Sequence, residues 1–175
     1  MATYYDHIIE EQATLIRKSP VFFVASADPG LGIGPDNIGP VNVSPKGGLP
    51  LTILNSNLVA YLDYPGSGNE MARHAEAGGP CTIMVCSFDE DSAIVRLYGD
   101  VRVTSIADSS IADDLLRVLP TPPEDPLRQV VELSVTRTAT SCGFGVPMMD
   151  LIRDRGKDDR GRHYFAPKDA PPVEI

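Results

Sequence analysis

Short apolar runs separated by turn-forming residues recur along this chain and predict a sheet-rich fold. The predicted strands lie at 21–27, 41–44, 51–54, 58–63, 81–88, 93–104 and 129–136, with 138–144 extending the last. Asn55-Ser56-Asn57 is predicted to form the hairpin turn between 51–54 and 58–63. Gly99 falls inside the longest strand, where it indicates either the bend of a barrel corner or an ordinary β-bulge. Both interpretations favour a curved sheet.

Four shorter segments have the pattern of helices. They are predicted at 6–18, 68–77, 106–116 and 147–155, with Asp6 as the N-cap of the first and Pro20 ending it. Residues 156–175 are charged and contain several prolines, and we expect a tail that packs on the domain or on a partner subunit. One domain, residues 1–155, is therefore expected to precede this tail.

Composition narrows the class of protein. The 175 residues carry a formal net charge of −9, which argues against nonspecific nucleic-acid binding and against docking on an anionic membrane. No apolar run reaches membrane-spanning length and residues 1–11 lack the apolar core of a signal peptide, so we expect a soluble cytoplasmic protein. The three scattered cysteines, Cys81, Cys86 and Cys142, fit neither a disulfide framework nor a zinc site and are expected to be reduced. No metal site is expected.

Two stretches contain residues suited to binding an anion. The first, Val41-Asn42-Val43-Ser44-Pro45-Lys46-Gly47, is a short alternating strand that ends near a lysine. The second, residues 61–74, runs from a strand through a glycine-rich loop into a helix that carries Arg73. Backbone N–H groups and the helix dipole favour a phosphate at such a point, and side-chain cations add charge. The alternative is a plain turn and helix cap, with Arg73 on a solvated face.

These stretches resemble the pyridoxamine 5'-phosphate oxidase-like family. The resemblance begins at Phe22-Phe23-Val24-Ala25-Ser26, continues through 42–47 and 62–70, and takes in Arg96-Leu97-Tyr98-Gly99-Asp100-Val101. A last piece, residues 140–147, is similar to a branch of the family with poorly defined activity. The resemblance implies a mainly β fold with flanking helices (α+β), a six-stranded antiparallel split β-barrel. It also implies a homodimer that binds flavin mononucleotide (FMN).

The resemblance further implies which residues bind the cofactor. Lys46 matches the lysine that reaches the flavin, and Ser67, Asn69 and Arg73 match the loop and helix that hold the phosphate. The implied cofactor-binding set is Asn42, Val43, Ser44, Lys46, Tyr61, Ser67, Asn69 and Arg73. Asn42 and Ser44 share one face of their strand, where they either hydrogen-bond the flavin or face solvent. Tyr61 either flanks the flavin ring or is a core residue.

The implied activity is that of an FMN-dependent oxidoreductase acting on a small molecule that the sequence does not identify. The acidic C-terminus does not match the Trp- and Arg-bearing C-terminus of the true vitamin oxidases, so oxidation of pyridoxamine phosphate is disfavoured. Family members that use a deazaflavin or haem, and a flavin-binding protein without turnover, are the alternatives. No catalytic residue stands out. Cys142 lacks an obvious His partner, and we interpret residues 141–147 as a pocket wall or a dimer contact.

Overall fold

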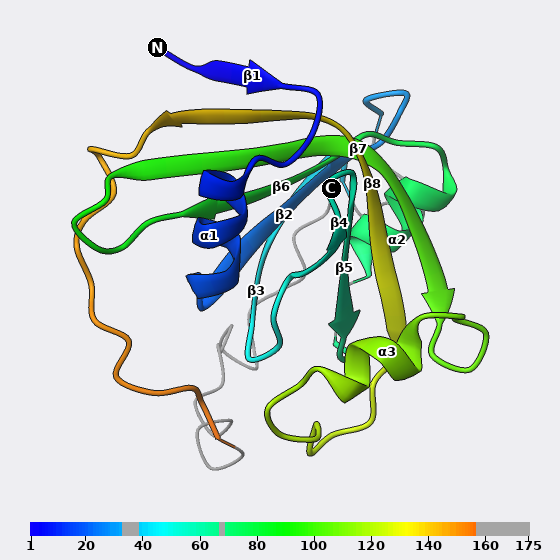
Figure 1. Cartoon of the computed structure of the whole chain (residues 1–175). Coiled ribbons are helices and arrows are strands. Elements are labelled where there is room, and N and C mark those ends of the chain that lie inside the picture. Colours follow the sequence, from blue (N-terminus) through cyan, green and yellow to red (C-terminus); the bar gives the residue numbers. More distant parts are fainter. Residues whose placement is uncertain (33–38, 67–68, 157–175) are drawn as a thin grey trace, which may run out of the picture.

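The computed structural model describes residues 1–32, 39–66 and 69–156. In this part of the chain eight strands form one sheet in the order β3-β2-β6-β7-β8-β5-β4, and β1 pairs with β8 (Figure 1). The strands are β1 (Thr3–Tyr5), β2 (Val21–Ala27), β3 (Val41–Gly47), β4 (Thr52–Asn55), β5 (Leu58–Asp63), β6 (Cys81–Cys86), β7 (Ala93–Ser105) and β8 (Gln129–Cys142). The helices are α1 (Glu10–Lys18), α2 (Glu70–Glu76) and α3 (Ala112–Arg117).

The sheet curves into a barrel that does not close. Every strand pairing is antiparallel, and the path of paired strands ends at β3 on one side and at β4 on the other. The prediction of a mainly β, split antiparallel barrel with flanking helices is therefore confirmed, with eight strands in the described residues instead of six. One addition is β1, whose three residues are too few to show an alternating pattern.

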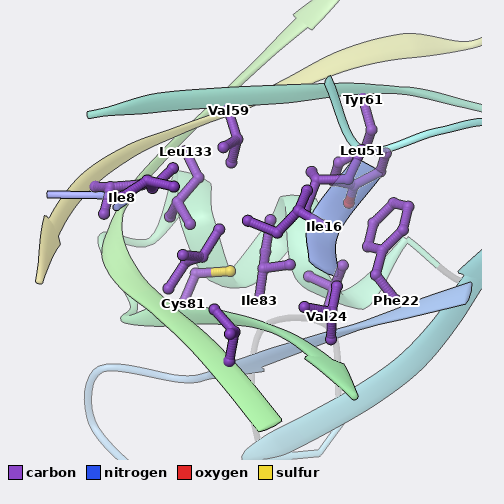
Figure 2. Packing of buried hydrophobic residues seen from close by; sticks show 14 of the residues in the cluster. Ile8, Ile16, Phe22, Val24, Leu51, Val59, Tyr61, Cys81, Ile83 and Leu133 are labelled. Carbon is purple, nitrogen blue, oxygen red and sulfur yellow. The ribbon is translucent and has the colours of Figure 1, made fainter. Parts of the chain in front are cut away.

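Alternation along the strands builds the core. The inward-facing apolar residues of the barrel strands pack against one side of α1, and Figure 2 shows Ile16 of α1 in one cluster with Val24 of β2 and Ile83 of β6. Cys81 and Cys86 are buried. A second, smaller apolar cluster lies between α3 and the other face of β5 and β8. The barrel interior is thus filled by side chains rather than open.

Both interpretations of Gly99, a β-bulge and a bend of the sheet, apply. The register of β7 against β8 shifts between Tyr98 and Gly99, which is a bulge. A Cβ atom at Gly99 would overlap the backbone oxygen of Ser134, so the two strands approach too closely for any side chain. The curvature predicted from this glycine is present.

The first helix begins later than predicted, because the residues before Glu10 are held in a bend by contacts with the β4–β5 turn. Ile8 N donates a hydrogen bond to Ser56 O (2.8 Å), and Asn57 Nδ2 donates to Asp6 O (2.8 Å). Asp6 is therefore not the N-cap. Ile9 takes that position, and its N–H donates to the side chain of Gln12 in the first turn (3.3 Å).

The helix predicted at 147–155 is wrong. Residues 147–156 form neither helix nor strand. Met149 N donates to Phe88 O (2.9 Å), which ties the segment to the β6–β7 hairpin. The third helix is also shorter than the predicted 106–116, because a turn at Ser105 precedes it. Of the predicted tail, residues 157–175 lie outside the described residues.

Candidate cofactor-binding site

The inner face of the edge strand β3 is polar. The strand continues through Pro45 to Gly47, further than predicted, because an edge strand tolerates a residue without an N–H. Asn42, Ser44 and Lys46 are half-buried on one face, opposite Ser26, Val24 and Phe22 of β2. Asn42 Nδ2 donates to Ser44 Oγ (3.1 Å). The prediction that Asn42 and Ser44 share a face is confirmed, and Lys46 shares it.

Asp63, the last residue of β5, joins side chains from separate segments. Its carboxylate accepts hydrogen bonds from Lys46 Nζ (2.7 Å), Arg128 NH2 (2.8 Å) and Gln129 Nε2 (2.9 Å). Gln129 Nε2 also donates to Asn69 Oδ1 (3.0 Å). We call these five residues the Asp63 cluster. They bring together the end of β3, the end of β5, the start of β8 and the residue before α2.

Asp63 is the buried member of this cluster, and the cations Lys46 and Arg128 are its partly exposed members. The Asp63 side chain is 6% exposed, whereas those of Lys46 and Arg128 are each 25% exposed. Burial would raise the pKa of Asp63, but the hydrogen bonds from Lys46 and Arg128 outweigh it and hold that pKa below its usual value. With two cations and one carboxylate, the cluster carries one net positive charge.

Asn69 belongs to the cluster by contact, whereas Arg73 lies near it only through α2. Asn69 precedes α2 without capping it by its side chain. Arg73 is half-buried one turn further along, with its backbone N donating to Asn69 O (3.1 Å). A helix of seven residues adds little dipole, so any anion here would depend on side-chain cations.

Tyr61 lies in the core beneath Lys46. Its ring packs edge-on against Phe22, with centroids 5.1 Å apart (Figure 2), and Lys46 Nζ lies 5.9 Å from its centroid. The Tyr61 hydroxyl is buried and has no hydrogen-bond partner among the described residues. Burial raises the pKa of Tyr61 well above its usual value. Tyr61 is therefore a core tyrosine as the sequence allowed, but its hydroxyl is unsatisfied.

His74 is a structural link rather than a catalytic base. It is fully buried, with Nε2 3.0 Å from Gly39 O and Nδ1 2.9 Å from Ser26 Oγ. Since a carbonyl oxygen only accepts, Nε2 donates to Gly39 O, and Nδ1 shares a hydrogen bond with the Ser26 hydroxyl. Both ring nitrogens are used to hold α2 against β2 and the chain before β3.

The remaining nucleophile and metal candidates gain no support. Burial raises the pKa of Cys81 to about 12, which makes that thiol inert. Cys142 is exposed, and its Sγ accepts from Phe144 N (3.4 Å). In residues 1–32, 39–66 and 69–156, no group of three or more His, Cys, Asp and Glu side chains is placed to hold a metal ion. No helix within these ranges is both long and apolar enough to cross a membrane.

A cavity of ≈ 1020 Å³ opens beside the Asp63 cluster. Gly47 and Tyr64, which directly follow Lys46 and Asp63 in the chain, line it together with the end of α1, residues 121–125 and residues 149–156. None of the predicted cofactor residues that the structure describes lines this cavity. Its walls mix apolar side chains such as Phe88 and Met149 with charges of both signs.

The predicted site residues thus fall into separate places. Lys46 and Asn69 are in the Asp63 cluster, Asn42 and Ser44 lie further along the inner face of β3, and Ser67 lies outside the described residues. The side chain of Val43 is 63% exposed and points to the opposite face of β3. Their binding of a cofactor stays a prediction.

Sequence reasoning missed Asp63, Arg128 and Gln129. A signal for Asp63 was available, because alternation with Val59 and Tyr61 puts this carboxylate on the inward face of β5. An inward charge needs a partner. Arg128 could not have been found in this way, because its pairing with Asp63 depends on the register of β5 against β8.

A curated relative and several solved structures agree with this architecture. A comparison with family models gives no match. Over 157 residues the chain is 34% identical to ustO of Aspergillus flavus, a pyridoxamine 5'-phosphate oxidase family protein. That match covers 88% of this chain and 59% of the relative, so the chain spans about three fifths of the length of the curated relative it matches.

Solved structures share the fold at lower identity. A Lactobacillus delbrueckii protein, provisionally named a pyridoxamine 5'-phosphate oxidase, has a TM-score of 0.56 and 21% identity, covering 77% of this chain and 94% of its own. HupZ of Group A Streptococcus has a TM-score of 0.56 and 16% identity, covering 75% of this chain and 91% of its own. At these identities the structures define the fold class, an antiparallel split barrel. The sequence likeness to ustO then confirms the resemblance to the pyridoxamine 5'-phosphate oxidase-like family.

Proposed function

We propose that this protein is an FMN-dependent oxidoreductase that acts on a small molecule. The observation that carries the proposal is the Asp63 cluster, which holds Lys46 and Arg128 as a partly exposed pair of cations at the end of the polar face of β3. The family resemblance supports a flavin as the phosphorylated ligand. The residues present are compatible with that ligand.

The donor set suits a phosphorylated flavin. A quarter of the Lys46 side chain and a quarter of the Arg128 side chain are exposed, so both cations can be reached by a phosphate. Asn42 and Ser44 would supply amide and hydroxyl groups to the ribityl chain or the ring. Asn69, together with the predicted residues Arg73 and Ser67, would complete the set of groups that bind the phosphate.

Bound FMN would supply the hydride or electron transfer, and the chain would supply position and electrostatics. Lys46 would stabilise negative charge on the ring or the phosphate. The cavity beside Gly47 and Tyr64 would take the substrate next to the cofactor. No residue is assigned as a general acid or base, since His74 has both ring nitrogens bonded and the Tyr61 hydroxyl is buried.

A homodimer is part of the proposal. On the outer face of β2 and β3, Phe23 and Ala25 lie beside Pro45 and Val43. Val41 and Val43 are 62% and 63% exposed, so an apolar sheet face has no covering layer within the described chain. A second copy packed on this face would bury it. The free cysteines agree with a cytoplasmic location.

A flavin-binding protein without turnover is the second candidate. It is favoured by the engagement of His74 and the burial of Tyr61, which leave no acid–base group assigned next to the cluster. A deazaflavin would use the same phosphate-binding side chains. Haem has less support, because His74 has no ring nitrogen left for iron.

The test is to purify the protein and to identify what co-purifies by absorbance and mass spectrometry. The proposal predicts a yellow protein whose flavin bands bleach when NAD(P)H is supplied without oxygen, as hydride passes from the nicotinamide to the flavin. Stable flavin colour that no physiological donor bleaches would favour the binding protein. A colourless protein that does not take up FMN would contradict the proposed function.

A further inference from the structure

The carboxylate of Asp63 binds two cations that come from different strands. Its Oδ1 accepts from Lys46 at the end of β3, and its Oδ2 accepts from Arg128 at the start of β8. The two residues lie 82 positions apart (128 − 46) and have no backbone pairing with each other, because β3 pairs with β2 and β8 pairs with β1, β5 and β7. Asp63 is thus a direct side-chain connection between them.

Burying the carboxylate of Asp63 costs free energy, and its surroundings favour its charged form. A carboxylate at 6% exposure loses most of its hydration and needs its hydrogen bonds. Three donors from β3 and β8 supply them. Replacing a whole buried ion pair by packed apolar residues often costs little stability, so stability alone does not account for a charged group here.

The positions of Lys46 and Arg128 on either side of Asp63 indicate a further role for this carboxylate. Lys and Arg side chains are long and flexible, and two such cations side by side repel each other. By binding one from each side, Asp63 keeps both near one point with their exposed parts available to solvent. Two cations fixed before the ligand arrives can bind a phosphate without a new ordering cost.

We propose that Asp63 is a positioning residue that fixes Lys46 and Arg128 for the phosphate of the bound flavin. The inference rests on the proposed function, and it deepens the assignment of the same site. Asp63 itself does not contact the phosphate, because two anions would repel. The opposite role would be an internal anion that competes with the phosphate for both cations, and the two roles predict affinity changes of opposite sign.

The experiment compares FMN with riboflavin, which has the same ring and ribityl chain without the phosphate. Dissociation constants are measured by flavin fluorescence for the wild type, Asp63→Ala and Asp63→Asn. Positioning predicts that FMN affinity falls by about tenfold or more in Asp63→Ala, since Lys46 and Arg128 must then be ordered when the phosphate binds. It also predicts that riboflavin affinity stays within about threefold and that Asp63→Asn, which keeps one acceptor oxygen, lies between.

Glu132→Gln is the matched control. Glu132 is a similarly buried carboxylate, 11% exposed, that accepts from Arg102 Nε (3.1 Å) and NH2 (2.9 Å) outside the cluster. The affinities of the Glu132→Gln protein for FMN and for riboflavin should both stay at the wild-type values. Unfolding midpoints of all variants establish that a folded protein is titrated.

A wild-type measurement covers the case in which the variants do not fold. The carboxyl carbon signal of Asp63 is followed by NMR before and after FMN is added. Positioning predicts that Asp63 stays ionised and hydrogen-bonded to Lys46 in the complex.

The other results overturn the inference. FMN affinity that rises in Asp63→Ala, or an Asp63–Lys46 bond that breaks on FMN binding, would identify Asp63 as a competitor. Equal losses for FMN and riboflavin, or no loss, would reduce Asp63 to a structural residue. A wild type that binds neither flavin refutes the proposed function as well, whereas a wild type that prefers FMN with an unchanged Asp63→Ala refutes only the positioning role.

Discussion

At the scale of single residues, two buried polar groups differ in how well they are satisfied. Asp63 has three donors, whereas the Tyr61 hydroxyl has no partner among the described residues. An unsatisfied buried hydroxyl costs stability unless a ligand or a water supplies the bond. Both groups lie on the inward face of β5, so they report on the same region of the site.

Replacing Tyr61 by Phe removes the unsatisfied hydroxyl and keeps the ring contact with Phe22. We expect the free energy of unfolding of the cofactor-free protein to stay unchanged or to rise by about 1 kcal/mol. Chemical denaturation measures it. A loss above about 1 kcal/mol would show that the hydroxyl has a partner in solution.

The pH dependence of stability follows from the lowered pKa of Asp63. A carboxyl whose pKa is lower in the folded than in the unfolded state stabilises the fold above the unfolded value. That contribution is lost as the pH falls through the folded pKa, so acid should destabilise the protein over this range. Urea unfolding of wild type and Asp63→Asn between neutral and acidic pH measures the effect.

The variant should be less stable at neutral pH, and the difference should shrink on acidification. Asp89, whose pKa is held to about 2 by Lys18 and Ser87, titrates in the same direction in both proteins and cancels in the comparison. A difference that stays constant across the acidic range would mean that the pKa of Asp63 is not lowered.

At the scale of elements, the sheet depends on the bulge in β7. Gly99 lets β7 approach β8 where the register shifts, next to Ser134. The end of β5 pairs directly with the start of β8, whereas β3 lies at the other end of the strand order and reaches them through the curvature of the sheet. Replacement of Gly99 therefore tests the link between the sheet and the site.

Gly99→Ala should lower the free energy of unfolding by about 1–3 kcal/mol, because its Cβ would overlap the Ser134 oxygen. Gly145→Ala is the control, since a Cβ there meets nothing within 4 Å. Thermal and chemical unfolding compare the two. A Gly99→Ala protein as stable as the control would show that the strands can separate at little cost.

Elements with strong periodicity were predictable, and those that depend on distant partners were not. The hairpin at Ser56 and the buried strands followed from turn residues and alternation. The start of α1 did not, because Asn57, far along the chain, holds Asp6 in a bend before the helix. Residues 147–155 have helical composition, yet Met149 is bonded to Phe88 instead.

The same division holds for the site. Lys46 and the polar face of β3 were found from a local pattern in one strand. Arg128 was not, because it reaches the site only through the pairing of β8 with β5. Local signals thus locate half of the proposed anion site, and strand register supplies the other half.

At the scale of the whole molecule, the apolar outer face of β2 and β3 is the feature that a single chain leaves unexplained. The proposed homodimer covers it. Val43 is a suitable probe because its side chain is exposed and is outside the core.

Val43→Asp should convert the dimer to a monomer in sedimentation or light-scattering measurements, since it places a charge in an apolar interface. The unfolding of the resulting monomer should begin at a lower temperature. Val118→Asp is the control, because Val118 has a similar exposure of 62% and lies just after α3. A wild type that is a monomer at all concentrations, or a Val43→Asp protein that stays dimeric, would argue against the proposed interface.

Lys46 and Arg128, held by Asp63, are the phosphate-binding half of the proposed flavin site. Titration of the cofactor-free wild-type protein with FMN and with riboflavin is the decisive experiment for this assignment. We expect saturable binding of FMN at one molecule per chain, with riboflavin bound at least about tenfold more weakly. Equal affinity for the two flavins, or binding of neither, would refute the assignment.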